Sequence, residues 1–249
     1  IYMILLIDIG NTNTVLGVYD KNKYLYTSRI NSESQFEVEL KSLIKYNIDE
    51  IAISSVVPIF TKSFSKIIKQ YFQINPFLIS FSNCNKIILN VEQSKEVGND
   101  RICNTRAAIE LTKKNCLVLD FGTATTYDVI NDKQEFIGGA IAPGIKVSAE
   151  NLINKASLLK NTTFDFPDKI IGRNTITNIQ SGVMFGAVFS IEGMIQNIEK
   201  ELNTKLDIIL TGGFSKLISS KLSFKHKLEP NLTLDGIRLI YEDNHVSKQ

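Results

Sequence analysis

Short apolar runs alternate with longer amphipathic stretches along most of the chain. Apolar runs bounded by small or polar residues predict buried strands, and they occur at residues 5–8, 48–57, 117–121 and 206–211. Apolar residues at helical spacing predict amphipathic helices, and they occur at residues 36–47, 61–72, 98–114 and 181–203. Strands that alternate with helices in this way predict an α/β fold.

Two segments of the chain match each other without a gap. Residues 5–21, LLIDIGNTNTVLGVYDK, align with residues 117–133, LVLDFGTATTYDVINDK. The identical positions include Asp8 with Asp120, Gly10 with Gly122, and Thr14 with Thr126. Each segment reads as a strand, a tight turn, a second strand and a polar turn, so each predicts a β-hairpin.

The elements that follow each hairpin also repeat their order. An amphipathic helix is followed by an apolar strand that ends in small residues, and a further helix follows that strand. We therefore predict two pseudo-equivalent halves, residues 1–114 and 115–249, each a mixed sheet flanked by helices. A cleft is expected between the halves.

Composition narrows the class of protein. The 249 residues include 28 Lys and Arg against 26 Asp and Glu, so the net charge of +2 gives no broad basic surface and we expect no nucleic-acid partner. No apolar run approaches the roughly 18 residues of a membrane span, so we expect no membrane partner. The three cysteines lie in no Cys-x-x-Cys spacing, which favours a reduced cytoplasmic protein over a disulfide framework or a zinc site.

The two hairpin turns carry residue types that suit a cation and a phosphate. In each turn an aspartate ends a buried strand, and Gly and Thr residues follow it. Gly10 and Gly122 allow the backbone to approach a ligand closely, and N–H groups and Thr hydroxyls donate to phosphate oxygens. Asp8 and Asp120 could hold a metal ion or its water shell. The alternative is a plain tight hairpin, but two copies in a duplicated chain favour a nucleotide site.

Three other segments each allow two interpretations. Gly212 and Gly213 follow a strand, where their backbone suits either the flat face of a base or a simple turn into a helix. Asp100 and Arg101 begin a long predicted helix, where Asp100 is a helix cap, a general base beside a guanidinium, or both, since the two roles are compatible. Residues 138–145, GGAIAPGI, are either a mobile loop over the site or a tight connection into the next helix.

Six motifs occur in order along the chain, namely DIGNTNTVLGVYD, EVGNDRICN, DFGTATTYDV, GGAIAPGI, IGRNT followed by QSG, and TGGFS. In these motifs, and in EPNLTLDGIRLIY near the end, the chain resembles the type III pantothenate kinases over nearly its whole length. The resemblance implies the fold of the actin, sugar-kinase and Hsp70 superfamily: duplicated ribonuclease-H-like (actin-like ATPase) domains with mixed five-stranded sheets flanked by helices. It also implies transfer of the γ-phosphate of ATP to the primary hydroxyl of pantothenate, giving 4′-phosphopantothenate in the first step of coenzyme A synthesis.

The resemblance implies roles for individual residues as well. Asp100 would be the general base, Arg101 a catalytic contact, Asp8 a Mg²⁺ ligand and Asp120 a ligand of a monovalent cation, K⁺ or NH₄⁺. The residues expected to bind ATP are Asp8, Ile9, Gly10, Asn11, Thr12, Asn13, Thr14, Val15, Gly122 and Thr123, with Gly212 and Gly213 added from the strand pattern. The residues expected to bind pantothenate are Val91, Gly98, Asn99, Asp100, Arg101 and Thr175. Thr175 would come from the neighbouring subunit, so a homodimer is implied.

The chain departs from the family pattern at two places. Asn99 stands where the family usually has Ala, which enlarges the side chain beside Asp100. Residues 91–94, VEQS, stand where the family usually has Tyr-Asp-Asn-Pro, so no aromatic side chain is present at Val91. These changes affect the shape of the expected pantothenate pocket more than the phosphate chemistry.

Two other functions were weighed against this one. The first is a kinase of the same superfamily that acts on another small molecule, such as a sugar or an acid, although the GNDR and GRNT segments favour pantothenate. The second is a regulatory nucleotide-binding or DNA-associated protein that has lost catalysis. The presence of Asp8, Asp100, Arg101, Asp120 and Thr123 argues against lost chemistry.

Overall fold

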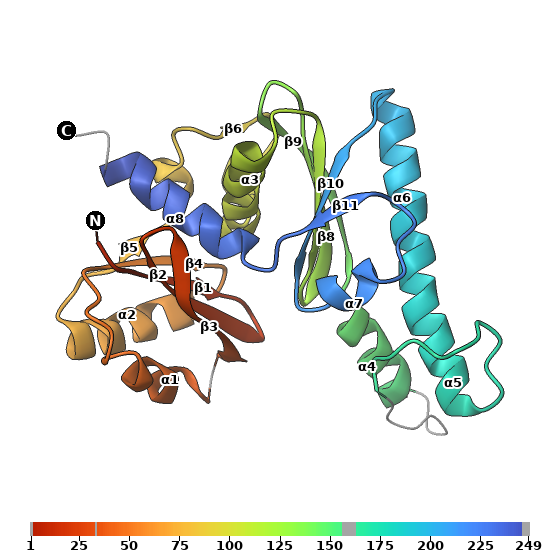
Figure 1. The fold of residues 1–249 in the computed structure, drawn as a ribbon, viewed down its shortest axis with the longest axis horizontal. Helices are drawn as coiled ribbons and strands as arrows, with labels where there is room; N and C mark the ends of the chain where they lie inside the picture. Colours follow the sequence, from red (N-terminus) through yellow and green to blue (C-terminus); the bar gives the residue numbers. More distant parts are fainter. Residues whose placement is uncertain (1, 33, 156–162, 246–249) are drawn as a thin grey trace. The chain divides into compact units, whose positions relative to one another are not determined.

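The computed structural model describes residues 2–32, 34–155 and 163–245. The chain divides into two compact units (Figure 1). The first unit is Ile1–Leu111 together with Asn231–Gln249, and the second is Thr112–Pro230. No helix in the described residues is long and apolar enough to cross a membrane.

A five-stranded mixed sheet forms the centre of the first unit. Its strands run in the order β3-β2-β1-β4-β5, with bounds β1 Ile4–Ile9, β2 Asn13–Asp20, β3 Lys23–Asn31, β4 Glu50–Ser55 and β5 Phe77–Leu78. β1 pairs antiparallel with β2 and parallel with β4. The predicted first hairpin is therefore confirmed. β2 and β3 are joined by Lys21 and Asn22, whose φ angles of 47° and 68° suit the tight turn of a hairpin.

Helices cover both faces of this sheet. Alternate residues of β1 face opposite sides, as the pleat requires. Leu5, Ile7 and Ile9 pack with α1 (Phe36–Ser42) and α2 (Pro58–Phe72). Ile4 and Leu6 pack with α3 (Asn99–Leu111) and α8 (Leu232–His245). Between α2 and α3 lie the short elements η1 (Phe81–Asn83), β6 (Ile88–Leu89) and η2 (Ser94–Glu96).

The last helix, α8, belongs to the first unit although it lies at the far end of the sequence. The sequence analysis assigned residues 115–249 to one half, whereas the structure groups residues from Asn231 onward with the first unit. The reason is apolar burial, because Leu234, Ile237 and Ile240 share a core cluster with Ile4 and Leu6 of β1. The division after Leu111 lies close to the expected boundary at residue 114.

The second unit repeats the topology of the first. Its strands are β7 Cys116–Phe121, β8 Ala124–Ile130, β9 Glu135–Pro143, β10 Asp207–Gly212 and β11 His226–Leu228. They run in the order β11-β10-β7-β8-β9, which is the third-second-first-fourth-fifth order of the first unit read from the other edge. β7, β8 and β9 are antiparallel neighbours, and β10 pairs parallel with β7. The predicted second hairpin and the duplication of the α/β half are confirmed.

The helices of the second unit pack on one core cluster of its sheet. Leu117, Leu119 and Phe121 of β7 share this core with side chains from the following helices. The helices are α4 Ile145–Lys155, α5 Thr175–Gln180, the π-helical segment η3 Ser181–Phe185, α6 Gly186–Leu202 and α7 Ser215–Ser219. α5, η3 and α6 follow one another directly, so the helix predicted at residues 181–203 begins earlier, at Thr175.

Two details differ from the sequence analysis. Residues 138–143 are neither a loop nor a connection, because they form most of β9 and pair with β8; only Gly144 separates them from α4. The second hairpin turn is also one residue shorter than the first, with Phe121 opposite Thr125 where Ile9 is opposite Thr14. A shift of one residue reverses the face of a side chain. Thr126 therefore stands opposite Asp120, whereas Val15 stands opposite Asp8.

Candidate active site

The first hairpin turn places Asp8 at the end of a buried strand, next to exposed backbone. Gly10 N–H donates to the Asn13 carbonyl at 3.0 Å, which closes the turn. The Ser32 hydroxyl, directly after β3, donates to the Gly10 carbonyl at 3.2 Å and so links the turn to the end of that strand. Asn11 and Thr12 are exposed at its tip. The turn therefore offers backbone and side-chain donors beside the Asp8 carboxylate.

Some residues expected to bind ATP face the protein interior instead. Ile9 is fully buried and packs in the core with α1 and α2. Thr14 is also fully buried, and its hydroxyl shares a hydrogen bond of 2.9 Å with the Ser32 hydroxyl. Val15 packs against the opposite core cluster. These three side chains pack within the protein and fix the turn, so the exposed part of the turn is Asn11 and Thr12.

Asp8 is held by a residue that the sequence analysis did not single out. The hydroxyl of Ser54, on β4, donates to Asp8 Oδ1 at 3.1 Å, and Ser54 is fully buried. The described residues contain no group of three His, Cys, Asp or Glu side chains suited to a metal. Mg²⁺ in kinases is usually held by one or two carboxylates together with substrate phosphates and water. A single carboxylate beside an exposed turn therefore fits Mg²⁺ carried in with a nucleotide.

The start of α3 carries the second acidic group. Asp100 Oδ1 accepts a hydrogen bond of 2.8 Å from Arg101 N–H, so the carboxylate caps the first turn of the helix. The Asn99 amide donates to the Ser55 carbonyl at 3.0 Å. Burial raises the pKa of the Asp100 carboxyl above its ordinary value, although the Arg101 N–H and guanidinium act to lower it. A half-buried carboxylate with a raised pKa has the properties of a general base.

Asp8 and Asp100 lie near each other in the first unit. Ser54 and Ser55 are consecutive residues at the carboxyl end of β4, and one contacts Asp8 while the other contacts the residue before Asp100. Burial raises the pKa of the Cys103 thiol well above its ordinary value, and the negative charges of Asp8 and Asp100 both add to this effect. The structure thus brings the two predicted acids to one edge of the sheet.

Val91, the remaining expected contact in this unit, lies apart from these elements in the sequence. It is half-buried in the segment between β6 and η2.

The second hairpin turn carries the same kinds of residue, Asp, Gly and Thr, but is one residue shorter. Asp120 is the next-to-last residue of β7, and Gly122 N–H donates to the Ala124 carbonyl at 3.0 Å. The Thr123 side chain is exposed, and its carbonyl accepts from Gly144 N–H at 3.1 Å. The turn is therefore tied to the start of α4.

Gly212, at the end of β10, is in direct contact with Asp120. Its φ angle is +88°, and a methyl carbon in place of its hydrogen would lie 2.4 Å from Asp120 Oδ1. Only glycine combines this conformation with so close an approach. Gly213 is exposed beside it. The structure therefore brings Asp120 together with the Gly212–Gly213 turn.

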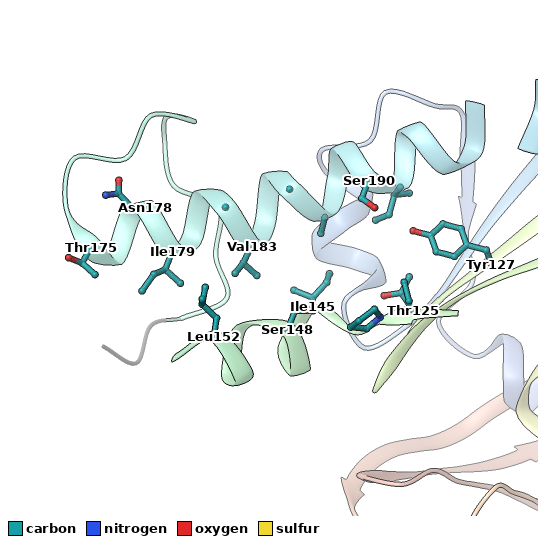
Figure 2. Close-up of a pocket in the computed structure, with 16 residues that line it drawn as sticks. Thr125, Tyr127, Ile145, Ser148, Leu152, Thr175, Asn178, Ile179, Val183 and Ser190 are labelled. Atoms are coloured by element: carbon teal, nitrogen blue, oxygen red, sulfur yellow. The ribbon is translucent and has the colours of Figure 1, made fainter. Parts of the chain in front are cut away.

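A pocket of about 760 Å³ opens within the second unit (Figure 2). Its lining comes from β8, the end of β9, α4 and the run from α5 to α6. Tyr127 and Ser190 lie at one end, and Thr175 and Asn178 lie at the other. Thr175 itself is exposed. The sequence analysis expected a role for Thr175 but did not predict this pocket, whose lining residues are scattered along the sequence.

Comparison with known proteins identifies the family. The model of the type III pantothenate kinase family matches residues 4–197. A type III pantothenate kinase from Halalkalibacterium halodurans is 40% identical, with 97% of this chain and all of the relative covered. One from a Geobacillus species, strain WCH70, is 38% identical over 99% of this chain and all of the relative.

Solved structures share the fold at low sequence identity. A Campylobacter jejuni protein described as a conserved Baf family transcriptional activator has a TM-score of 0.62 at 21% identity, covering 96% of this chain and 98% of its own. MreB5 of Spiroplasma citri has a TM-score of 0.53 at 9% identity, covering 100% and 99%. These likenesses confirm the duplicated actin-like ATPase fold. Because its matches to the family model and to full-length curated relatives span most of the sequence, the chain belongs to the type III pantothenate kinase family.

Proposed function

We propose that this chain transfers the γ-phosphoryl group of ATP to the primary hydroxyl of pantothenate, giving 4′-phosphopantothenate at the start of coenzyme A biosynthesis. The observation that carries the proposal is the half-buried Asp100 carboxylate at the start of α3, in a member of the type III pantothenate kinase family. A primary alcohol is a poor nucleophile near neutral pH, so its attack benefits from a positioned base.

Asp100 acts as this base. Its carboxylate takes the hydroxyl proton as the new O–P bond forms and the bond from phosphorus to the ADP oxygen breaks. The Arg101 guanidinium, one residue on in α3, contacts the substrate and the transferring group. Gly98, Asn99 and Val91 complete the contacts to pantothenate.

The phosphates of ATP are bound by backbone and side chains of the hairpin turns. Asp8 holds Mg²⁺, which neutralises phosphate charge and stabilises the transferring group. Backbone groups at the tip of the first turn and the exposed Asn11 and Thr12 side chains donate to phosphate oxygens. In the second unit, Gly122 and Thr123 are the proposed ATP contacts of the second turn, and the exposed backbone of Gly213 is the proposed contact for the base.

Asp120 binds a monovalent cation, K⁺ or NH₄⁺. Its carboxylate lies beside Gly212, where the ends of β7 and β10 pair with each other. Carboxylate and carbonyl oxygens are suitable ligands for such an ion, and its charge would offset that of the phosphates.

The working enzyme is a cytoplasmic homodimer in which Thr175 reaches the partner's substrate. Support comes from the face of the helical run that carries Gly182, Gly186 and Gly193, because space around each is open for a side chain. Ile176 and Phe189 are large apolar residues exposed on the same run. Small residues that leave such a face open suit the close approach of a second helix.

The activity is tested with pantothenate, ATP and Mg²⁺, with and without K⁺, in an assay coupled to ADP formation. We expect turnover with pantothenate that Asp100→Asn lowers by about 10² to 10⁴-fold. A panel of sugars and small hydroxy acids separates this function from that of another small-molecule kinase. Turnover with one of those acceptors but not with pantothenate would overturn the proposed substrate.

Mixing two inactive variants tests the contribution of Thr175 across the dimer. Asp100→Asn and Thr175→Ala homodimers are each expected to be impaired. If Thr175 acts on the partner's site, a mixed dimer contains one site with both residues intact, so mixing restores activity. Failure to recover activity after verified subunit exchange would place both residues on the same site.

A further inference from the structure

The last two residues of β4 are hydrogen-bonded to Asp8 and to the residue that precedes Asp100. Ser54 lies opposite Asp8 in the parallel pairing of β1 and β4. Its hydroxyl donates to Asp8 Oδ1 at 3.1 Å, and the Ser54 side chain is completely shielded from solvent. A buried donor on a carboxylate restricts the directions in which that carboxylate can turn. Ser54 therefore sets the orientation of Asp8.

The next residue of the strand is bonded to the start of α3. The Ser55 carbonyl accepts a hydrogen bond of 3.0 Å from the Asn99 side chain. A carbonyl oxygen can only accept, so the amide nitrogen of Asn99 must be the donor. Asn99 is the first residue of α3 and directly precedes Asp100. The bond therefore fixes the helix turn that carries Asp100 to the end of β4.

A third hydrogen bond joins the junction between the end of β4 and the start of α3 to β1. Val56 N–H donates to the Ile9 carbonyl at 3.2 Å, which extends the pairing of β4 with β1 past the end of the sheet. Residues 54, 55 and 56 are thus hydrogen-bonded, in that order, to Asp8, to the start of α3 and to β1.

We propose that the carboxyl end of β4 is a brace that sets the position of Asp8 relative to Asp100, with Ser54 and Asn99 as its positioning residues. This inference rests on the proposed function, because it assigns Asp8 to the metal nucleotide and Asp100 to the acceptor hydroxyl. Phosphoryl transfer depends on aligned reactants, and a displacement of about 1 Å can lower the rate about 100-fold. Ser54 acts on the binding of the metal nucleotide and Asn99 acts on the transfer step, so substitutions of the two residues should have different kinetic effects.

The same junction offers a matched control. The Thr61 hydroxyl, on α2, donates to Ser55 Oγ at 2.7 Å and lies 3.0 Å from the Val57 carbonyl. These bonds belong to the same strand end but lead to neither acid. Thr61→Val keeps the shape of the side chain and removes both bonds, so it should lower thermal stability without altering kcat or nucleotide affinity.

The experiment compares Asn99→Ala, Asn99→Asp, Ser54→Ala and Thr61→Val in the full chain. Calorimetry measures the Kd of the Mg²⁺ complex of a non-hydrolysable ATP analogue, and steady-state kinetics measure kcat and the KM of pantothenate. We expect both Asn99 variants to lower kcat by about tenfold or more at unchanged nucleotide Kd. Ser54→Ala should raise that Kd by about 10 to 100-fold, since groups that orient a metal ligand typically have effects of this size.

Three results would overturn the brace. They are wild-type kcat in folded Asn99→Ala, wild-type nucleotide Kd in folded Ser54→Ala, and the same kinetic losses in Thr61→Val, which would indicate general loosening. If the wild-type chain does not phosphorylate pantothenate, the proposed function fails instead. The nucleotide Kd then still tests whether Ser54 orients Asp8, and the rate of intrinsic ATP hydrolysis tests whether Asn99 positions Asp100.

Discussion

The hydrogen of Gly98 points at the carboxylate of Asp100, so closely that a methyl carbon in its place would lie 2.5 Å from Oδ1. The Asp100 carboxylate turns back over this glycine to reach the N–H of Arg101. Gly98 thus provides the space in which the proposed base is held.

Gly98→Ala should separate activity from folding. The new methyl group conflicts with the end of a side chain rather than with backbone, so the fold can accommodate it by turning Asp100 away. We expect kcat to fall by about 10 to 100-fold, as for a displaced catalytic group, with a small change in Tm. The control is Gly98→Ala in the Asp100→Asn background, where the added loss should be small. An equal loss in both backgrounds would mean that Gly98 acts independently of Asp100.

The raised pKa of Asp100 should be visible in the pH dependence of activity. A base must be ionised, so kcat should fall as the pH drops through the raised pKa, at higher pH than for an ordinary aspartate. A pH profile of kcat for the wild type measures this limb. The residual activity of Asp100→Asn should lack it, and a limb that remains there would belong to another group.

The same shift predicts a stability effect of the opposite sign. A carboxyl whose folded pKa is raised binds its proton more tightly when folded, so the folded state loses stability as the pH rises from the unfolded pKa through the folded pKa. Asp100→Asn should therefore raise Tm near neutral pH and have little effect at pH values below the unfolded pKa. Thermal melts at several pH values test this, and a variant that is less stable than wild type at neutral pH would contradict it.

Gly212→Ala should disturb the contact between β10 and Asp120. The φ angle of +88° is unfavourable for alanine, and its methyl group would meet backbone atoms of Phe121 at 2.5 Å as well as Asp120. We expect a loss of about 1 to 3 kcal/mol in the free energy of unfolding, together with weaker stimulation by K⁺. Chemical denaturation and a K⁺ titration of activity provide the two measurements. An intact K⁺ response in Gly212→Ala and in Asp120→Asn would remove the cation from this site.

Arg106 should matter for stability alone. It is buried on α3, where its Nε donates to Asp243 of α8 at 2.8 Å and its Nη1 donates to Glu110 at 3.0 Å. Arg106→Met removes the charged hydrogen bonds to Asp243 and Glu110, while Asp243 keeps its ion pair with Lys86 at 2.7 Å, so the variant should cost about 1.5 to 3 kcal/mol in the free energy of unfolding. Denaturant unfolding measures this loss, and kcat at low temperature should stay near the wild-type value.

The exposed pair formed by Lys41 and Glu37 is the matched control. Its N–O distance is also short, at 3.0 Å, but both side chains are about half exposed. Lys41→Met should leave the free energy of unfolding nearly unchanged, because solvent screens an exposed pair. Equal losses for the two variants would show that burial does not govern the Arg106 pair.

Local patterns account for the parts of the fold that the sequence predicted. The apolar runs that became β1, β4, β7 and β10, and the helical spacing that became α2, α3 and α6, depend on neighbours a few residues apart. The repeated Asp-x-Gly segments likewise predicted both hairpins. The one-residue difference between the turns was not predictable, because the register depends on contacts of the whole strand pair.

The candidate site depends on contacts that local sequence patterns do not predict. The motif order identified Asp8 and Asp100, but their connection runs through Ser54 and Ser55, which the sequence indicated only as small residues at a strand end. Hydrogen bonds such as that from Asn99 join segments that are distant in the chain, and no local spacing reports them. The placement of α8 against β1 was missed for the same reason.

The position of α8 also bears on how the protein is made. Leu234, Ile237 and Ile240 complete the apolar layer over β1 and β4, and the ribosome synthesises them after the whole second unit. Until they emerge, the core that α3 and α8 form over this side of the sheet is incomplete, so the first unit cannot finish folding before the second unit has been synthesised. A frameshift or early stop after residue 230 would therefore abolish catalysis by unfolding the part of the chain that was translated first.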